Sequence, residues 1–313
     1  MIRRLLAALL LLSVASVAGP VLAAVELVPD EPIGGKEITF KTDDGVTIVG
    51  NVFRPSKGEI KGGILFVHEP FRTSRDWAYL ADKMSRKGFV TMIFDLRGHG
   101  RSLMRGDETL DRELFADEDY QAMSSDVRAA LAVLRKQPGV PSDQIHVAGA
   151  DLGGSLSLML ANEDEGVRSV ALLSPGLGYD GVNVIGEVAK LGRRPLMLVF
   201  SMEDGYARKS TEVMQGEAVG PIHTETYYGV GHGTKMLAHE PKLEALMASW
   251  FLGTVIKPDG RRLEDAGKPL AGEKELAVDG LDADAERKRL EAQKAEADKR
   301  QGVGVGDEED EPK

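Results

Sequence analysis

The chain of 313 residues contains no cysteine. This absence excludes disulfide bonds, thiolate nucleophiles, cysteine-ligated zinc and the attachment of a lipid to a cysteine. Aromatic side chains are few, at 5% of residues, but apolar residues make up 42%, which is ordinary for a globular protein. Basic residues are also in deficit, with 39 against 50 acids and a formal net charge of −11. This charge argues against sequence-independent binding of nucleic acid, which requires a basic surface.

Residues 1–23 predict a secretory signal peptide. Arg3 and Arg4 give it a positive start, residues 5–18 are almost wholly apolar, and Ala23 ends a cleavage site of small residues. The apolar run is shorter than the roughly 20 residues that span a bilayer, so we expect cleavage rather than a retained anchor. The mature protein is therefore expected to be exported, periplasmic or secreted, without stable insertion in the membrane.

Residues 257–313 predict a charged C-terminal tail that we expect to be disordered. Residues 282–300 have high helix propensity, but Leu290 is their only large apolar residue, so a helix there would have no face to bury. Acids dominate the end of the tail at residues 307–311. A solvated tail is one interpretation, and contact with a basic partner is the other.

Residues 24–256 predict a single α/β domain. Two alternating runs within residues 37–53 flank the turn Asp43-Asp44-Gly45, which indicates an N-terminal antiparallel hairpin. Short apolar runs then alternate with segments of helical spacing, which indicates a mainly parallel sheet with helices on both faces. The predicted strands are 63–67, 91–95, 144–148, 169–174, 196–200 and 224–228, and the predicted helices are 77–86, 120–136, 152–161, 207–215 and 242–252.

Three candidate catalytic residues follow predicted strands. The strand at 144–148 leads into Gly149-Ala150-Asp151-Leu152-Gly153, which is the strand–turn–helix context of a G-x-S-x-G nucleophile motif with Asp151 where serine would stand. Asp204 follows the strand at 196–200, with Glu203 as a neighbouring alternative, and His232 lies between glycines after the last strand. Ligands of parallel sheets bind at the carboxyl ends of strands, so we predict Asp151, Asp204 and His232 as one catalytic set.

Over about residues 35–255 the chain resembles the α/β-hydrolase superfamily. The resemblance rests on four motifs in order, DLRGHGRS at 95–102, GADLGG at 149–154, SMEDGY at 201–206 and GVGHGT at 229–234. Within this superfamily the chain is similar to compact members that lack a cap domain, such as dienelactone hydrolases and serine aminopeptidases. The resemblance implies the α/β-hydrolase fold, hydrolysis of a small molecule, and an oxyanion-hole N–H from Leu152. We expect no cofactor, because the chain has neither a dinucleotide fingerprint nor a P-loop. We also expect no metal, because the acidic clusters at 107–111 and 117–119 are more typical of a solvated loop than of a calcium site.

Two positions depart from the superfamily pattern. The first is Asp151, because attack of a carboxylate on an ester gives a mixed anhydride, whereas attack on a carbon bearing a halide or epoxide gives an alkyl ester that water can hydrolyse. Haloalkane dehalogenases and epoxide hydrolases are similar in using aspartate there. The second is Pro70, which falls where the family supplies an oxyanion N–H that proline lacks. Phe71 is the alternative donor. His68 either lines the pocket or is a strand-end histidine that packs on the core.

Three functional interpretations remain open at this stage. The first is a hydrolase in which Asp151 attacks, His232 activates water and Asp204 orients His232. The second is a catalytically degenerate homologue, a pseudoenzyme that binds a ligand or acts as a scaffold. The third is ordinary ester or peptide hydrolysis by water that His232 activates directly. The substrate and the oligomeric state do not follow from the residues.

Overall fold

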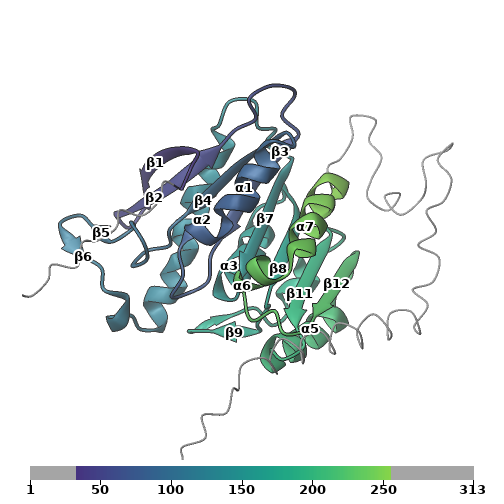
Figure 1. The fold of residues 1–313 in the computed structure, drawn as a ribbon. Helices are drawn as coiled ribbons and strands as arrows, with labels where there is room; N and C mark the ends of the chain where they lie inside the picture. Colours follow the sequence, from purple (N-terminus) through teal and green to yellow (C-terminus); the bar gives the residue numbers. More distant parts are fainter. Residues whose placement is uncertain (1–32, 255–313) are drawn as a thin grey trace, which may run out of the picture. The chain divides into compact units, whose positions relative to one another are not determined.

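The computed structural model describes residues 33–254, and a ten-stranded sheet with helices against both faces forms its centre (Figure 1). The strands are β1 (Lys36–Lys41), β2 (Val46–Phe53), β3 (Gly62–Val67), β4 (Phe89–Phe94), β5 (Met104–Arg105), β6 (Glu108–Thr109), β7 (Ile145–Ala150), β8 (Val167–Leu173), β9 (Gly178–Tyr179), β10 (Val182–Asn183), β11 (Leu196–Ser201) and β12 (Ile222–Tyr227). The helices are η1 (Ser74–Trp77), α1 (Ala78–Ser85), η2 (Arg112–Leu114), α2 (Asp117–Arg135), α3 (Leu152–Glu163), α4 (Glu187–Lys190), α5 (Gly205–Glu217), α6 (Lys235–His239) and α7 (Pro241–Thr254). The expected signal peptide, at 1–23, and the expected tail, at 257–313, lie outside the described residues.

The order of the strands across the sheet is β12-β11-β8-β7-β3-β4-β2-β5-β6, with β1 paired to β2. From β12 to β4 every neighbouring pair is parallel, whereas β1, β2, β5 and β6 add antiparallel pairs at the other side. The predicted mainly parallel sheet, covered on both faces and preceded by an antiparallel hairpin, is therefore confirmed. A separate two-stranded hairpin of β9 and β10 lies between β8 and α4 in the chain.

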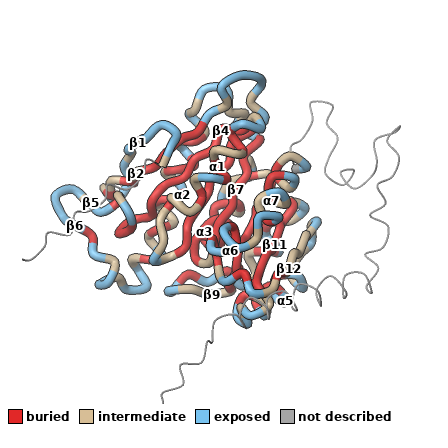
Figure 2. Tube along the Cα trace, in the orientation of Figure 1, coloured by how far each residue is buried: buried red, intermediate tan, exposed pale blue. Residues whose placement is uncertain are grey.

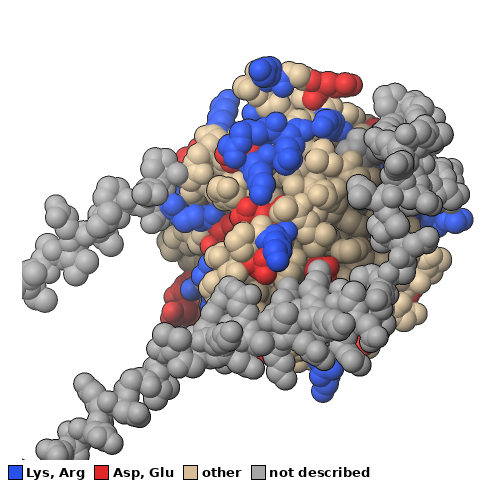
Figure 3. Space-filling model, turned by 45° about the vertical axis from the view of Figure 1, so that its right-hand side comes forward, with Lys and Arg blue, Asp and Glu red and all other residues tan. Residues whose placement is uncertain are grey.

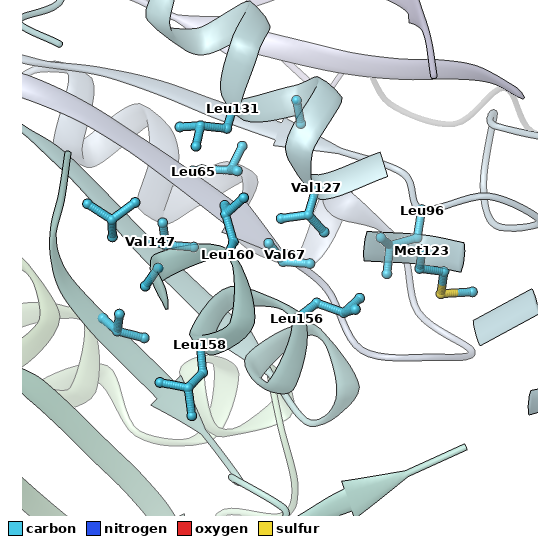
Figure 4. Packing of buried hydrophobic residues seen from close by; sticks show 14 of the residues in the cluster. Leu65, Val67, Leu96, Met123, Val127, Leu131, Val147, Leu156, Leu158 and Leu160 are labelled. Atoms are coloured by element: carbon cyan, nitrogen blue, oxygen red, sulfur yellow. The ribbon is translucent and has the colours of Figure 1, made fainter. Parts of the chain in front are cut away.

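The central strand β3 shows why both faces of the sheet are covered. Successive side chains of a strand point to opposite faces. Leu65 and Val67 join an apolar core with α2 and α3 (Figure 4), whereas Ile64 and Phe66 join a second core with α1 and α7. All of β3 is buried, as are most residues of its neighbours (Figure 2). Because burial of each such side chain contributes about 1.5–3 kcal/mol, β3 and its carboxyl end are held firmly in the middle of the sheet.

The motif at 95–102 forms a tight turn after β4 that anchors the segment before α1. Asp95 is buried and accepts hydrogen bonds from the N–H and the hydroxyl of Ser74, at 2.9 and 2.6 Å, and from the N–H of Arg101 at 3.1 Å. Gly100 has a φ of 49°, and a Cβ on it would lie 2.5 Å from the carboxyl carbon of Asp95. Glycine is therefore required at this position, and the motif has a structural role.

Charged side chains of both signs share the face of the molecule drawn in Figure 3, where a group of Lys and Arg side chains lies beside acidic ones. Some of the charged residues of the protein pair across elements, as Lys83 does with Glu244 at 3.1 Å. Salt bridges that stay in contact with solvent typically stabilise a protein by at most about 1 kcal/mol, so the cores dominate its stability. Among residues 33–254, no helix is long and apolar enough to cross a membrane.

Candidate active site

Asp151 lies at a strained turn between β7 and α3. Its φ is 53° and its ψ is −123°, a conformation that residues other than glycine seldom adopt. The turn is held by its own backbone, because the N–H of Asp151 donates to the carbonyl of Leu173 at 3.0 Å, and its carbonyl accepts from the N–H groups of Gly154 and Ser155. These hydrogen bonds therefore hold the strained turn, and with it the Asp151 side chain, at the carboxyl end of β7 and the start of a helix.

Two glycines make this turn possible. A Cβ on Gly149 would lie 2.2 Å from the carbonyl oxygen of Gly153, and a Cβ on Gly153 would lie 2.4 Å from that of His68. Real Cβ atoms do not approach backbone this closely, so β7, the first turn of α3 and the end of β3 fit together only because both side chains are absent. The spacing of the sequence motif thus has a steric cause.

Gly153→Ala is expected to destabilise the fold by about 1–3 kcal/mol, because the new methyl group meets the end of β3. Gly154→Ala is the matched control, since its Cβ would lie 3.4 Å from the nearest atom, the carbonyl oxygen of Gly149. Both changes gain up to about 1 kcal/mol of helix propensity, so their difference isolates the clash. Urea denaturation measures both. Equal stability of the two variants would contradict the steric explanation.

The three predicted catalytic residues form one hydrogen-bonded chain. His232 Nε2 lies 2.7 Å from Asp151 Oδ2, and His232 Nδ1 lies 2.6 Å from Asp204 Oδ2. Asp204 also caps α5, because its Oδ1 accepts the N–H of Ala207 at 3.0 Å. Glu203, the alternative acid, instead accepts from the hydroxyl of Ser201 at 2.6 Å. The structure thus selects Asp204 as the carboxylate on the second nitrogen of His232.

The hydrogen bonds between His232 and the two carboxylates shift the pKa values of His232 and Asp204. The hydrogen bond to Asp151, followed by the one to Asp204, raises the pKa of His232 to about 10. Burial opposes ionisation of Asp204, but the hydrogen bonds from His232 and Ala207 outweigh it, so the pKa of Asp204 lies below its ordinary value. At neutral pH His232 is therefore an imidazolium, and both of its N–H groups donate to carboxylates.

We expect the free energy of unfolding to decrease as pH rises from about 6.5 to about 10. The pKa of His232 is raised on folding from 6.5 to about 10, so its contribution is complete below the lower value and lost above the higher one. The slope will be shallower than the shift implies, because the side chain is 41% exposed and solvent screens it. Urea denaturation at several pH values measures the slope, and His232→Gln should remove it. The same slope in both proteins would contradict this assignment.

The second oxygen of Asp151 is also engaged. Its Oδ1 accepts a hydrogen bond from the N–H of Leu152, the residue predicted to donate to an oxyanion. That N–H lies at the start of α3, where the first turn of a helix leaves donors free for a negative charge. In this state the carboxylate of Asp151 itself occupies the donor that would otherwise face a substrate oxygen.

The loop after β3 places His68 in the core. His68 has no exposed surface, and its Nε2 accepts the N–H of Leu96 at 2.9 Å, so the ring is neutral. Burial also lowers its pKa, and of the two interpretations of His68 this environment fits packing on the core. Phe71 has a φ of 63°, is 68% exposed, and packs under the guanidinium of Arg112 at 4.9 Å. That Phe71 donates its N–H to an oxyanion stays a prediction.

Two residues near Asp151 were missed by the sequence analysis. Ser174, at the end of β8, accepts the N–H of Gly233 at 2.9 Å and hydrogen bonds to Asp204. Tyr179, on the hairpin of β9 and β10, donates to the carbonyl of Ser174 at 3.2 Å, and burial raises its pKa. The signal for Ser174 was available, because it is a polar residue at the carboxyl end of a strand beside β7. Tyr179 had no such signal.

A short hairpin stands where larger relatives carry a cap. Residues 176–195, which separate β8 from β11, hold only β9, β10 and α4. The hydroxyl of Tyr206 ties the hairpin to α5, since it accepts the N–H of Gly178 at 2.9 Å and donates to its carbonyl at 2.7 Å. The rings of Tyr206 and Tyr179 also meet edge to face, with centroids 5.3 Å apart. This hairpin is thus held in place beside the hydrogen-bonded residues Asp151, His232 and Asp204.

Asp151, Asp204, Glu69 and His232 lie close to one another. Even so, residues 33–254 contain no group of three His or carboxylate side chains arranged to hold a metal ion. The arrangement can supply a carboxylate nucleophile or base, a proton carrier in His232, and one backbone donor in Leu152. These are the parts of a hydrolytic site that works through protein groups.

Comparison with known proteins finds two curated relatives that match part of the chain. The thiohydrolase aneE of Aspergillus aculeatus is 27% identical over 143 residues, 44% of this chain and 41% of that protein. The polyketide transferase ATR5 of Stachybotrys chlorohalonatus is 26% identical over 146 residues, 46% of each chain. The chain thus spans less than half the length of these curated relatives.

A dienelactone hydrolase from Anabaena variabilis has a similar fold, with a TM-score of 0.53 at 19% identity, over 70% of this chain and 98% of that one. At this identity the likeness concerns the fold alone. The model of the α/β-hydrolase fold family matches residues 63–229, more than half of the chain, from β3 to the start of the histidine loop. Together with the sheet order and the strained turn at Asp151, this match shows that the chain belongs to the α/β-hydrolase family.

Proposed function

We propose that the protein is a hydrolase in which Asp151 attacks a saturated carbon that bears a halide or forms part of an epoxide. The observation that carries the proposal is the way the two oxygens of Asp151 are held. Oδ1 receives the N–H of Leu152, and Oδ2 faces His232 Nε2 at 2.7 Å. A nucleophilic carboxylate needs both features, since one oxygen becomes the carbonyl of an ester and the histidine must stand beside that ester.

In the first step an oxygen of Asp151 forms a bond to the substrate carbon. The bond from that carbon to the halide or to the epoxide oxygen breaks, and the leaving group takes the electron pair. The product is an alkyl ester of Asp151, a covalent intermediate that divides the reaction into two easier steps. The fixed turn at Asp151 supports this step, because a nucleophile held in one orientation loses little freedom on attack.

In the second step His232 changes its role. The hydrogen bond to Asp151 is the largest cause of the raised pKa of His232. Once Asp151 is an ester its charge is gone, so the pKa of His232 falls, its Nε2 proton is lost to solvent, and the ring can accept a proton from water. Asp204 holds the other N–H of the ring in place. The water oxygen bonds to the carboxyl carbon of the ester, while the Leu152 N–H stabilises the charge that develops on the ester oxygen. The bond from that carbon to the alkoxy oxygen then breaks, the alkoxide takes the proton from His232 and leaves as the alcohol, and Asp151 is again a carboxylate.

A single-turnover reaction in water enriched in the heavy isotope of oxygen tests the proposal. The panel contains haloalkanes, epoxides, an ester and a thioester, the last because one relative is named a thiohydrolase. With enzyme in excess, the first alcohol formed from a haloalkane or epoxide should carry light oxygen from Asp151. Heavy oxygen in that product would mean that water attacks directly and would overturn the covalent mechanism.

The second candidate is a binding protein without turnover. It is favoured by two observations: the Leu152 N–H is already occupied by Asp151, and Pro70 has no N–H to donate. This candidate predicts no turnover of any panel member by wild-type protein, together with ligand binding that His232→Gln alters. Turnover that depends on His232 would exclude it. We propose export for either candidate, as the sequence of residues 1–23 predicts.

A further inference from the structure

The hydroxyl of Thr234 lies between two carboxyl groups that come from a different part of the chain. Thr234 Oγ1 is 2.9 Å from Glu69 Oε1 and 3.0 Å from Asp76 Oδ2. Both contacts are at hydrogen-bond distance, and Thr234 is only 3% exposed. Thr234 follows His232 by two residues, whereas Glu69 lies two residues after the end of β3, so this cluster joins the histidine loop to the centre of the sheet.

The number of protons at this cluster is informative. A threonine hydroxyl carries one proton, and an ionised carboxylate carries none. If Glu69 and Asp76 were both ionised, the single hydroxyl proton would have to be shared between them in a weaker three-centre bond. The N–H of Thr234 also donates to Glu69, at 2.9 Å to Oε2 and 3.2 Å to Oε1. If one carboxyl is protonated, it donates to Thr234 Oγ1 and the threonine proton goes to the other, so that each contact holds a proton of its own. The geometry thus favours one neutral carboxylic acid.

The surroundings identify Asp76 as the ionised partner. Arg72 binds it with two parallel hydrogen bonds, Nε to Oδ2 at 2.6 Å and a terminal nitrogen to Oδ1 at 2.8 Å, which is the geometry of a guanidinium with a carboxylate. Asp76 and Thr234 also line a surface groove of about 510 Å³ together with Arg72 and Tyr79. The charged end of the cluster therefore faces solvent.

Glu69 has the surroundings of a neutral acid. It is only 5% exposed, and within residues 33–254 no Lys, Arg or His side chain lies at ion-pair distance from it. The charged and titratable groups that act on it from the elements packed around it are His232, Asp76, Arg72 and Tyr179. Burial is the largest influence and raises the pKa of Glu69, while the N–H and hydroxyl of Thr234 and the charge of His232 act against it.

We propose that Glu69 is a positioning residue that works as a neutral carboxylic acid, donating its proton to Thr234 while Thr234 donates to Asp76. This series of hydrogen bonds acts as a clamp that holds the loop carrying His232 against the end of β3. Gly233 fits the clamp closely, since a Cβ on it would lie 2.5 Å from Glu69 Oε2. A neutral Glu69 also spares His232 a third negative charge beside those of Asp151 and Asp204. The assignment concerns the resting protein and does not depend on whether Asp151 turns over a substrate.

Infrared spectroscopy of the full chain at neutral pH tests the proposal. Glutamate labelled with heavy carbon at its side-chain carboxyl distinguishes glutamic from aspartic acid groups. We expect a carboxylic-acid carbonyl band that shifts with the label, is absent in Glu69→Gln, and remains in Asp76→Asn. The labelled wild-type spectrum stands by itself if a variant fails to fold, because the absence of a label-sensitive acid band there overturns the proposal.

Two further measurements separate a neutral Glu69 from a charged one. The His232 pKa, followed by nuclear magnetic resonance, should be the same in Glu69→Gln as in wild type, because the glutamine keeps the donor to Thr234 and removes no charge. A fall in that pKa would show that Glu69 is ionised and would refute the assignment. Thr234→Val should shift the acid band and lower the melting temperature, and Thr234→Ser should restore both.

Discussion

Asp151→Asn is expected to abolish turnover of every substrate that the wild-type protein hydrolyses. The amide keeps the size of the side chain and can still accept the Leu152 N–H, but it is a poor nucleophile and no longer pairs as a carboxylate with His232. Removal of a nucleophile from a cooperating set costs about 10⁴-fold or more in kcat. Initial rates on the active members of the panel measure the loss, with circular dichroism to show that the variant is folded.

His232→Gln is the control that distinguishes the two halves of the reaction. Attack by Asp151 does not need a base, so the variant should form the alkyl ester and then stop, because no base activates water. Intact mass would rise by the mass of the alkyl group, and the same treatment should leave Asp151→Asn unmodified. Turnover that survives in Asp151→Asn but not in His232→Gln would instead favour water attacking directly.

The fold and the chain of three catalytic candidates could be predicted because their signals are local. Each strand is a short apolar run, and each candidate stands where a strand ends, next to glycines. Parallel strands bring such ends to one edge of a sheet, so Asp151, Asp204 and His232 were expected at the same edge once the strands were assigned. The steric requirement at Gly149 and Gly153 explains why the motif has glycine at these two positions.

The open alternatives and the omissions concern side chains whose partners are distant in the sequence. His68 stands at a strand end as the candidates do, yet it is covered by Gly153 on one side and bound by the Leu96 N–H on another. The clamp of Glu69 joins residues 165 positions apart, and no local pattern signals it. Whether a strand-end residue points into a site or into the core depends on the packing of other segments over it.

Asp151→Ser is expected to give little esterase activity, although it restores the nucleophile that is usual in this family. An ester needs an oxyanion hole with two donors, and serine would free the Leu152 N–H that Asp151 now occupies. The other donor is missing if Pro70 holds its position, because proline has no N–H. Loss of one donor costs about 2.7–4 kcal/mol of transition-state stabilisation, or about 10²–10³-fold in rate.

The decisive comparison is therefore between the esterase activity of Asp151→Ser and that of the double variant Asp151→Ser with Pro70→Gly. Glycine restores an N–H at position 70, so esterase activity should rise about 10²–10³-fold over Asp151→Ser alone, measured as kcat/KM on an activated ester. Melting temperatures of both variants control for changes in the loop after β3. Strong activity of Asp151→Ser by itself would mean that another group, such as the Phe71 N–H, completes the oxyanion hole. In that case the aspartate alone, and not the loop, separates this protein from serine hydrolases of the same fold.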